Sequence, residues 1–479
     1  MSLRALILGV TVVAATSASA VARQIASESG RRPSVLEQRE AIDTIFAPWT
    51  ASGSPGCAVG VFRNGAMAFA NGYGLASLEH GVPITPESVF YAGSVSKQFT
   101  AFAAALAMSR GQLAYEDSIR KYLPELPPYA DAIRIRHLLH HTAGLRDYNT
   151  LLAIAGRRDE DAWDNRAVLR ITARQHALNF EPGSEYLYSN TGYTLLATIV
   201  ERATGTPFAA YADEQIFKPL GMTSSHFHTD ARRLVTHRAL GYGGRSGAWT
   251  MDTPINERAG AGGLYTSIPD LLKWDENFYT AKVGGPAVIA QVQTRGTLND
   301  GTTLPYAWGL QIGEWSARAI VEHSGSLGGY RAHLFRVPAA RTSVALLCNT
   351  ATASTASLAR QVAALVLDGR TEAPRLPAGA AGSIIGRVPD ATTAAANRAY
   401  AGTFHSEELD ATFTVTARGD ELWMQRETDV APSVLRLEGP TDHFGFRSYT
   451  VKFVRDSART VTGFTIDAGR VRGIVFSKR

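Results

Sequence analysis

Apolar residues form short strand-like runs at positions 57–73 and 303–348, and the stretch from about 113 to 300 is mostly helical in pattern. Cys57–Arg63 and Ala66–Tyr73 are separated by Asn64-Gly65, which predicts a β-hairpin with a type I′ turn. The later runs are Thr303–Trp315, Ala317–His323, Arg331–Val337 and Ser343–Cys348. We therefore expect an α+β fold, in which both groups of strands form one antiparallel sheet with flanking helices and an all-helical subdomain.

Three further segments have helical character. Val35–Trp49 and about Ser354–Leu367 have helical spacing, and Phe99–Met108 is apolar on nearly all sides, which is typical of a buried helix. Residues 369–397 are rich in Ala, Gly, Pro and Thr and lack periodicity, which indicates a linker. From Tyr400 onward the chain alternates in short runs, so residues 398–479 are expected to form a small all-β domain, a sandwich or a barrel. A chain cut near residue 385 should then leave a folded first unit.

The N-terminus has the pattern of an export signal. A short basic start is followed by apolar Ala5–Ala15 and by the small residues Ala18-Ser19-Ala20. We expect a signal peptide at residues 1–20, with an uncleaved membrane anchor as the alternative. No later stretch is apolar enough to span a membrane, so residues 21–368 are expected to form an exported first domain, periplasmic or secreted.

Composition narrows the class of protein. The 479 residues are 45% hydrophobic and 19% charged, which is typical of a folded chain and excludes disorder. The net charge of +5 comes with no basic run, so no nucleic-acid partner is expected. The 48 basic residues divide into 7 Lys and 41 Arg. Cys57 and Cys348 each lie in an apolar run, where we expect buried free thiols, with a disulfide as the alternative.

Ser-x-x-Lys is the first candidate for chemistry, and it occurs as Ser94–Lys97 and as Ser118–Lys121. Ser94 precedes the buried helix, where free backbone N–H groups and the helix dipole stabilise an oxyanion. Lys97 lies one turn further on, and burial would lower its pKa enough for it to accept the serine proton. Ser118 lies among charged residues and is expected to be a helix N-cap.

Two later motifs add polar groups. Tyr188 and Asn190 precede an apolar helix, where a tyrosine near a lysine could ionise and act as a base while the amide binds a substrate carbonyl. His323 precedes Gly325 and Ser326 at the end of a strand-like run. The Ser326 amide is a candidate second oxyanion donor, and His323 is a cationic or hydrogen-bonding group. Read alone, each motif is more typical of packing, capping or a glycine-rich turn.

In this order and spacing, the three motifs resemble the class C β-lactamase, DD-peptidase and D-aminopeptidase group of penicillin-recognising serine hydrolases. The segments Leu138–Leu145 and Gly260–Leu264 also match that pattern. The resemblance implies a site between an α/β sheet domain and a helical domain. It implies that Ser94 is the acyl-forming nucleophile and that Lys97 and Tyr188 share the proton transfers. Asn190 would then orient substrate, and the residues after Tyr400 look like an appended lipocalin-like barrel.

One departure from the family pattern bears on the substrate. Class C β-lactamases carry Lys-Thr-Gly at the third motif, whereas this chain has His323-Ser324-Gly325, and histidine is mostly neutral at pH 7. We therefore expect an exported acyl-enzyme hydrolase of small D-amino-acid peptides or amides. An esterase or weak β-lactamase on the same site is the first alternative, and a non-enzymatic penicillin-binding or sensing module is the second.

No cofactor is expected. His137 and His141 are four residues apart, but they lack the glutamate of an His-Glu-x-x-His motif and an obvious third ligand, so no metal site is expected either.

Overall fold

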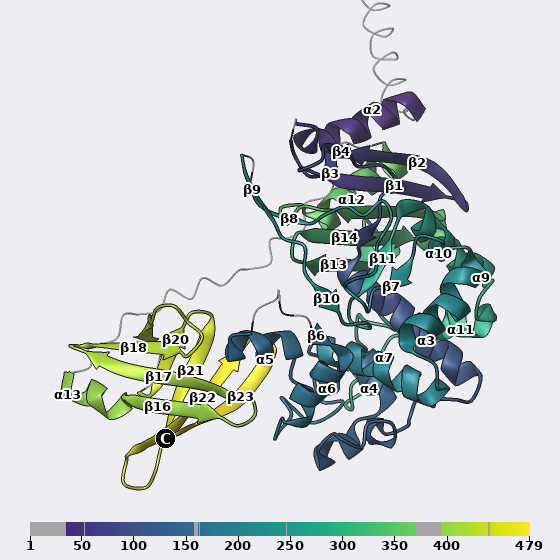
Figure 1. Cartoon of the computed structure of the whole chain (residues 1–479). Helices are drawn as coiled ribbons and strands as arrows, with labels where there is room; N and C mark the ends of the chain where they lie inside the picture. The colour runs from purple at the N-terminus through teal and green to yellow at the C-terminus, as the bar shows by residue number, and fades with distance from the viewer. Residues whose placement is uncertain are drawn as a thin grey trace, which may run out of the picture.

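A six-stranded antiparallel sheet forms the centre of the first part of the chain (Figure 1). The computed structural model describes residues 35–51, 53–157, 161, 163–245, 247–369, 394–438 and 441–479. The strand order is β12-β13-β14-β15-β1-β2, so strands from both groups join in one sheet, as predicted. The strands are β1 (Cys57–Arg63), β2 (Ala66–Tyr73), β12 (Gln311–Trp315), β13 (Arg318–Leu327), β14 (Tyr330–Val337) and β15 (Thr342–Cys348).

The predicted hairpin is confirmed and one predicted strand is shorter than expected. Asn64 and Gly65 have φ of 51° and 78°, the two positive values that a type I′ turn requires. Of the run Thr303–Trp315, only Gln311–Trp315 is a strand. Pro305 lacks a backbone donor and Gly309 has φ of 71°, so the residues before β12 cannot continue the ladder.

Helices cover both faces of this sheet. On one face, Ile42 and Phe46 of α2 (Val35–Phe46) and Leu358 of α12 (Thr355–Asp368) share a core with the strands. On the other, α10 (Ile268–Thr280) contacts β1 and β15, and α3 (Ser96–Ser109) is buried from Ser96 through Ala107, which confirms the predicted buried helix. The remaining helices of this part are α4 (Ile135–Leu139), α5 (Tyr148–Ala155), α6 (Asn165–Ala173), α7 (Asn190–Thr204), α8 (Phe208–Ala212), α9 (Lys218–Leu220) and α11 (Gly285–Val292), and most of them form the helical subdomain.

Short strands complete the first part. They are β3 (Leu75–Ser77), β4 (Val82–Pro83), β5 (Phe90–Tyr91), β6 (Trp163–Asp164), β7 (His226–Phe227), β8 (Tyr242–Arg245), β9 (Ala248–Met251), β10 (Asn256–Glu257) and β11 (Leu264–Thr266). Within the described residues, no helix combines the length and apolar character needed to cross a bilayer. The predicted signal peptide at 1–20 lies outside the described residues.

Cys57 and Cys348 form a disulfide, so the expectation of two free thiols is wrong. They are directly opposite each other in the β1–β15 pairing, with Cα atoms 4.0 Å apart, and both side chains are fully buried. Their sequence separation is 291 residues. Only the strand register brings them together, and neither apolar run specifies that register by itself.

The last part of the chain is a closed eight-stranded barrel, as the alternating runs after Tyr400 predict. Its strands are β16 (Gly402–Ser406), β17 (Ala411–Arg418), β18 (Glu421–Arg426), β19 (Ser433–Leu437), β20 (His443–Phe446), β21 (Tyr449–Arg455), β22 (Val461–Ala468) and β23 (Val471–Lys478). Of the predicted linker 369–397, residues 370–393 lie outside the described part, and Ala394–Asn397 forms the short helix α13.

The barrel packs against helix α5 of the helical subdomain (Figure 1). Leu151, Ile154 and Ala155 of α5 belong to the same buried apolar cluster as the barrel interior. Beside this contact, Arg146 Nη1 lies 2.6 Å from Glu408 Oε1, and both side chains are only 3% exposed. A cut near residue 385 would therefore expose the apolar surface of α5 and remove the partner of Arg146, so the expected stability of the first unit on its own stays a prediction.

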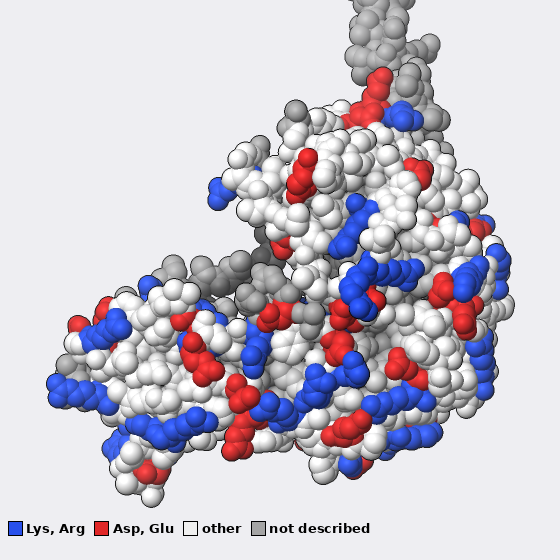
Figure 2. Space-filling view, in the orientation of Figure 1, with Lys and Arg blue, Asp and Glu red and all other residues white. Residues whose placement is uncertain are grey.

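Charged side chains of both signs are interspersed over the face shown in Figure 2. Exposed pairs such as Arg202–Glu125 and Arg136–Glu116, at 2.7 and 3.0 Å, place opposite charges together. The net charge of +5 is therefore not gathered into one basic stripe on this face.

We expect Glu408→Gln to destabilise the full-length protein by up to about 3–5 kcal/mol, because the buried Arg146 guanidinium loses its counter-charge. Glu185→Gln is the matched control: it breaks the half-exposed Arg472–Glu185 pair at the same junction, and should cost less than about 1 kcal/mol. Urea-unfolding midpoints measure the difference. Equal midpoints would contradict a structural role for the buried pair.

Candidate active site

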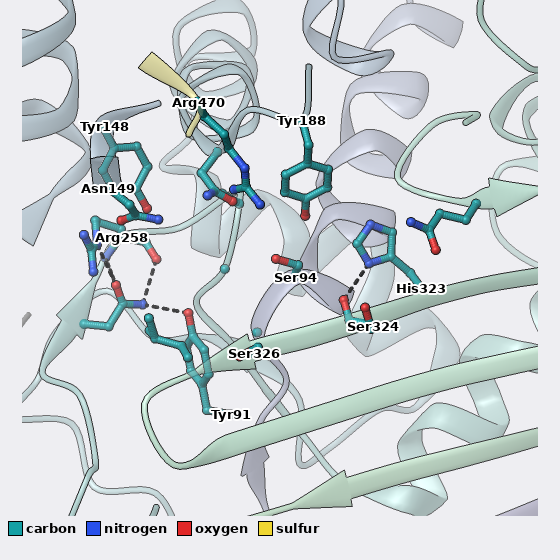
Figure 3. Close-up of a pocket in the computed structure, with 17 residues that line it drawn as sticks. Tyr91, Ser94, Tyr148, Asn149, Tyr188, Arg258, His323, Ser324, Ser326 and Arg470 are labelled. Carbon is teal, nitrogen blue, oxygen red and sulfur yellow. Dashed lines mark hydrogen bonds between the residues drawn. The ribbon is translucent and has the colours of Figure 1, made fainter. Parts of the chain in front are cut away.

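A pocket of about 470 Å³ lies between strand β13, the helical subdomain and the barrel turn that joins β22 to β23 (Figure 3). Its lining includes five of the seven predicted site residues, namely Ser94, Tyr188, Asn190, His323 and Ser326. Lys97 contacts Ser94 and Asn190 from behind this lining, and Gly325 lies in β13 between two lining serines. The structure thus brings all seven residues together.

Lys97 is fully buried beneath Ser94. Ser94 lies in the 3₁₀ turn η2 (Gly93–Val95), immediately before α3, and Lys97 lies in the first turn of that helix. Lys97 Nζ is 3.1 Å from Ser94 Oγ, 2.9 Å from Asn190 Oδ1 and 2.8 Å from the Ala261 carbonyl oxygen. Burial lowers the pKa of Lys97 well below its usual value, and the nearby Asp147 carboxylate opposes that shift only in part.

These three contacts define where the protons lie when the amine is neutral. A neutral amine has two hydrogens and one lone pair. The Ala261 carbonyl and the Asn190 amide oxygen can only accept, so they take the two hydrogens. The lone pair is then directed at Ser94 Oγ, whose hydroxyl donates to it. This arrangement would allow Lys97 Nζ to accept the proton of Ser94 Oγ.

Tyr188 remains protonated in this environment. Its ring lies 4.8 Å from Lys97 Nζ, and burial raises the pKa of the Tyr188 phenol above its usual value, opposed in part by Ser94 and Arg470. The expectation that this tyrosine ionises more easily than usual is therefore wrong. Desolvation outweighs the nearby groups that favour the phenolate, so Tyr188 is suited to donate a proton rather than to remove one.

Two glycines bring the turn of Ser94 against strand β13. A Cβ atom on Gly93, which has φ of 54°, would lie 2.4 Å from the Ser326 nitrogen. A Cβ atom on Gly325 would lie 2.0 Å from the Ala92 carbonyl oxygen and 2.9 Å from the Ser94 nitrogen. The amides of Ser94 and Ser326 can therefore face one site only because both positions lack a side chain.

His323 lines the pocket as a neutral side chain, and both of its ring nitrogens have hydrogen-bond partners. Its Nδ1 lies 2.7 Å from the Ser324 carbonyl oxygen, which can only accept, so Nδ1 carries the hydrogen. Nε2 then accepts from the Tyr306 hydroxyl at 3.0 Å. Burial lowers the pKa of His323 to about 3, and a protonated Lys97 would act in the same direction. Of the two roles expected for this residue, the hydrogen-bonding one fits and the cationic one is wrong.

Several site residues were not predicted from the sequence. The backbone N–H of Asn190 donates to Asp147 Oδ2 at 2.6 Å, and the backbone N–H of Ser189 donates to His141 Nδ1 at 3.1 Å. Asp147 and His141 therefore both hold the start of α7. Both, with Ala261, lie in or beside segments that the family pattern marks without assigning a role. Arg470, from the barrel, lines the pocket and has no sequence signal beyond its place in a tight turn.

The alternative motifs have structural roles. Ser118 caps the 3₁₀ turn η3 (Ile119–Lys121) through the Arg120 amide, as expected. His137 Nδ1 accepts from the Arg134 amide at the start of α4, whereas His141 packs its ring 4.2 Å from that of Tyr188. The two histidines therefore have separate partners instead of sharing a ligand face.

Comparison with known proteins places this site in a family. The family model described as Beta-lactamase matches residues 41–367, which is more than half of the chain. A D-aminopeptidase of Gluconobacter oxydans is 29% identical over 314 residues, 65% of this chain and 58% of the relative. A penicillin-binding protein of Bacillus subtilis is 30% identical over 304 residues, 60% of this chain and 66% of the relative. The matches thus span somewhat less than two thirds of each relative's length.

A solved structure shares the fold over almost the whole chain. The octameric penicillin-binding protein homologue from Pyrococcus abyssi aligns with a TM-score of 0.62 and 21% identity, covering 93% of this chain and 100% of that one. With the Ser-x-x-Lys, Tyr-x-Asn and His-x-Gly residues assembled around one pocket, and with the family model matching 41–367, the chain belongs to the beta-lactamase family.

Proposed function

We propose that this protein is an exported serine hydrolase that acts through an acyl-enzyme on small D-amino-acid peptides or amides. The observation that carries the proposal is the buried Lys97 nitrogen, 3.1 Å from Ser94 Oγ and with its hydrogens directed at two acceptor-only oxygens. A solvated lysine or a simple helix cap would not need this arrangement. The relatives named D-aminopeptidase support the substrate class.

The first half-reaction that we propose uses these contacts of Ser94 and Lys97. Ser94 Oγ attacks the substrate carbonyl carbon while its proton passes to Lys97 Nζ. The carbonyl oxygen becomes an oxyanion between the amides of Ser94 and Ser326. As the C–N bond breaks, the leaving amine takes a proton from Tyr188, which recovers one from Lys97. The acyl group then remains as an ester on Ser94.

Water completes the cycle by the reverse proton path. A water molecule gives its proton to the Tyr188–Lys97 pair and attacks the acyl-enzyme carbonyl carbon. The same oxyanion site stabilises the second tetrahedral intermediate, and Ser94 leaves with a proton from Lys97. Asn190 contributes by fixing Lys97 through its Oδ1 atom and by offering its N–H₂ group toward the substrate.

The disulfide supports export. Disulfides persist in oxidising compartments and are rare in the cytosol, and the Cys57–Cys348 bond joins two strands of the central sheet. It agrees with the export pattern read at residues 1–20.

We expect Ser94→Ala to abolish labelling by a fluorophosphonate and to reduce hydrolysis roughly 10⁴-fold or more, because the nucleophile is removed. Ser118→Ala is the control, since it alters the other Ser-x-x-Lys motif and should leave both unchanged. Turnover is measured on D-alanyl amide, p-nitrophenyl ester and cephalosporin substrates. Labelling without turnover of any substrate would favour a binding module, and hydrolysis that survives Ser94→Ala would refute the proposal.

We expect Lys97→Ala and Lys97→Arg to slow acylation by a similar factor, about 10²–10⁴, because arginine keeps a cation but cannot accept a proton. Lys121→Ala, in the exposed motif, should have no effect. Acylation needs the neutral amine, which is lost as pH falls through the folded pKa of Lys97. Since burial lowers that pKa, the acidic limb of kcat/KM should lie well below pH 10.5. Near-normal acylation by Lys97→Arg would exclude Lys97 as the base.

A further inference from the structure

The turn between β22 and β23 carries Arg470 from the barrel into the wall of the catalytic pocket (Figure 3). Its guanidinium carbon lies 4.7 Å from the centre of the Tyr188 ring. In Figure 3 the Arg470 side chain descends toward the same space that Ser94 and Tyr188 face. One wall of the pocket is thus supplied by a different domain from the one that supplies the nucleophile.

The backbone of this turn is clamped to the helical subdomain. The Arg470 carbonyl oxygen accepts from Asn179 Nδ2 at 2.9 Å and from the Asp147 amide at 3.3 Å. The next residues are held as well, because Asn179 Oδ1 accepts from the Arg472 amide and Arg146 donates to the Arg472 and Gly473 carbonyl oxygens. The Cα of Arg470 therefore has a fixed position relative to Ser94.

The N–H groups of the Arg470 guanidinium, in contrast, are available to a ligand. The side chain is 42% exposed, and the structure gives it no hydrogen bond from its guanidinium to any other described residue. The nearest carboxylate, that of Asp147, is 3.9 Å away and already accepts from the amides of Asn149, Thr150 and Asn190. An arginine that is positioned by its backbone, and whose guanidinium has only a long ion pair with Asp147 and a contact with the Tyr188 ring, is suited to bind a planar anion.

The charged side chains that line the pocket are all positive among the described residues, leaving histidine aside. Among the described residues, neither Asp nor Glu lines it, whereas Arg470 and the buried Arg258 both do. Arg258 donates its Nε–H to Asn256 and stacks on the Tyr148 ring. A substrate ammonium would meet no counter-charge on these walls, while a carboxylate would meet two guanidinium groups.

We propose that Arg470 binds a carboxylate of the substrate, so that this enzyme prefers D-amino-acid peptides or related acyl compounds that carry a free carboxylate over those whose only charge is an N-terminal ammonium. The inference rests on the proposed hydrolase function and names the substrate class of its site. Because His323 is neutral with both ring nitrogens occupied, the barrel supplies the positive charge that the third motif lacks.

Two matched pairs of esters test the proposal. In the first, N-acetyl-D-alanine is esterified with phenol or with m-hydroxybenzoate, so that only the leaving group gains a carboxylate. In the second, the p-nitrophenyl ester of D-alanine carries an N-acetyl or an N-succinyl group, so that only the acyl side gains one. The ratio of kcat/KM for the anionic over the neutral member is measured for the full-length wild type, Arg470→Gln and Arg459→Gln. Arg459, in an exposed turn of the same barrel, is the matched control.

We expect the anionic member of at least one pair to be preferred about tenfold or more, the size of one hydrogen bond to a charged partner, with that preference lost in Arg470→Gln and kept in Arg459→Gln. Arg470 also lowers the pKa of Lys97 and of Tyr188, but such an effect changes both members of a pair equally and leaves the ratio unchanged. No preference in either pair, or one that survives Arg470→Gln, would overturn the proposal.

Binding without catalysis separates this inference from the hydrolase function. Calorimetry on Ser94→Ala compares N-acetyl-D-alanine with its neutral amide, and then repeats the comparison in Ser94→Ala/Arg470→Gln. Tighter binding of the carboxylate that depends on Arg470 supports the anion site even when no ester is turned over. Equal binding of acid and amide in Ser94→Ala contradicts it, whatever the enzyme hydrolyses.

Discussion

The side-chain nitrogen of Lys97 has no access to water, so its chemistry depends on three oxygens from three distant segments of the chain. Ser94 comes from the turn before α3, Asn190 from the start of α7 and Ala261 from a glycine-rich loop. An ammonium buried in this way is disfavoured, and the neutral amine that replaces it is a base. The sheet, the helical subdomain and the loop must all be in place for this one atom to be correctly surrounded.

Two consecutive residues connect that environment to the barrel. Arg146 is directed toward the barrel, where it pairs with buried Glu408. Asp147 is directed toward the site, where its carboxylate accepts a hydrogen bond from the backbone N–H of Asn190. The same carboxylate raises the pKa of Lys97 against the effect of burial. The backbone of Asp147 also donates to the carbonyl oxygen of Arg470. Residues 146 and 147 thus contact the barrel on one side and the start of α7 on the other.

Short segments of sequence predict individual helices, strands and turns, but they do not predict which distant segments pair. The Asn64-Gly65 hairpin and the buried helix after Ser94 depend on turn chemistry and apolar periodicity, which a short segment contains in full. The Cys57–Cys348 bond depends on the register between strands 291 residues apart, which neither strand encodes alone. The same holds for Arg470, because a barrel turn cannot be docked onto a helical subdomain from its own sequence. The raised pKa of Tyr188 lies beyond the sequence for another reason, because the burial of its phenol comes from neighbours that only the fold supplies.

The histidine of the third motif and the arginine of the barrel turn can be understood together. His323 occupies the motif position without charge, because Tyr306 and the Ser324 carbonyl use both of its nitrogens and burial keeps it neutral. Arg470 restores a cation to the pocket from the opposite domain, 4.7 Å from the Tyr188 ring. Arg470 lies on a turn of the barrel, whereas a charge on strand β13 would lie next to the Ser326 amide. In the proposed mechanism, the residues that break the bond and the residue that binds the substrate carboxylate therefore lie in different parts of the fold.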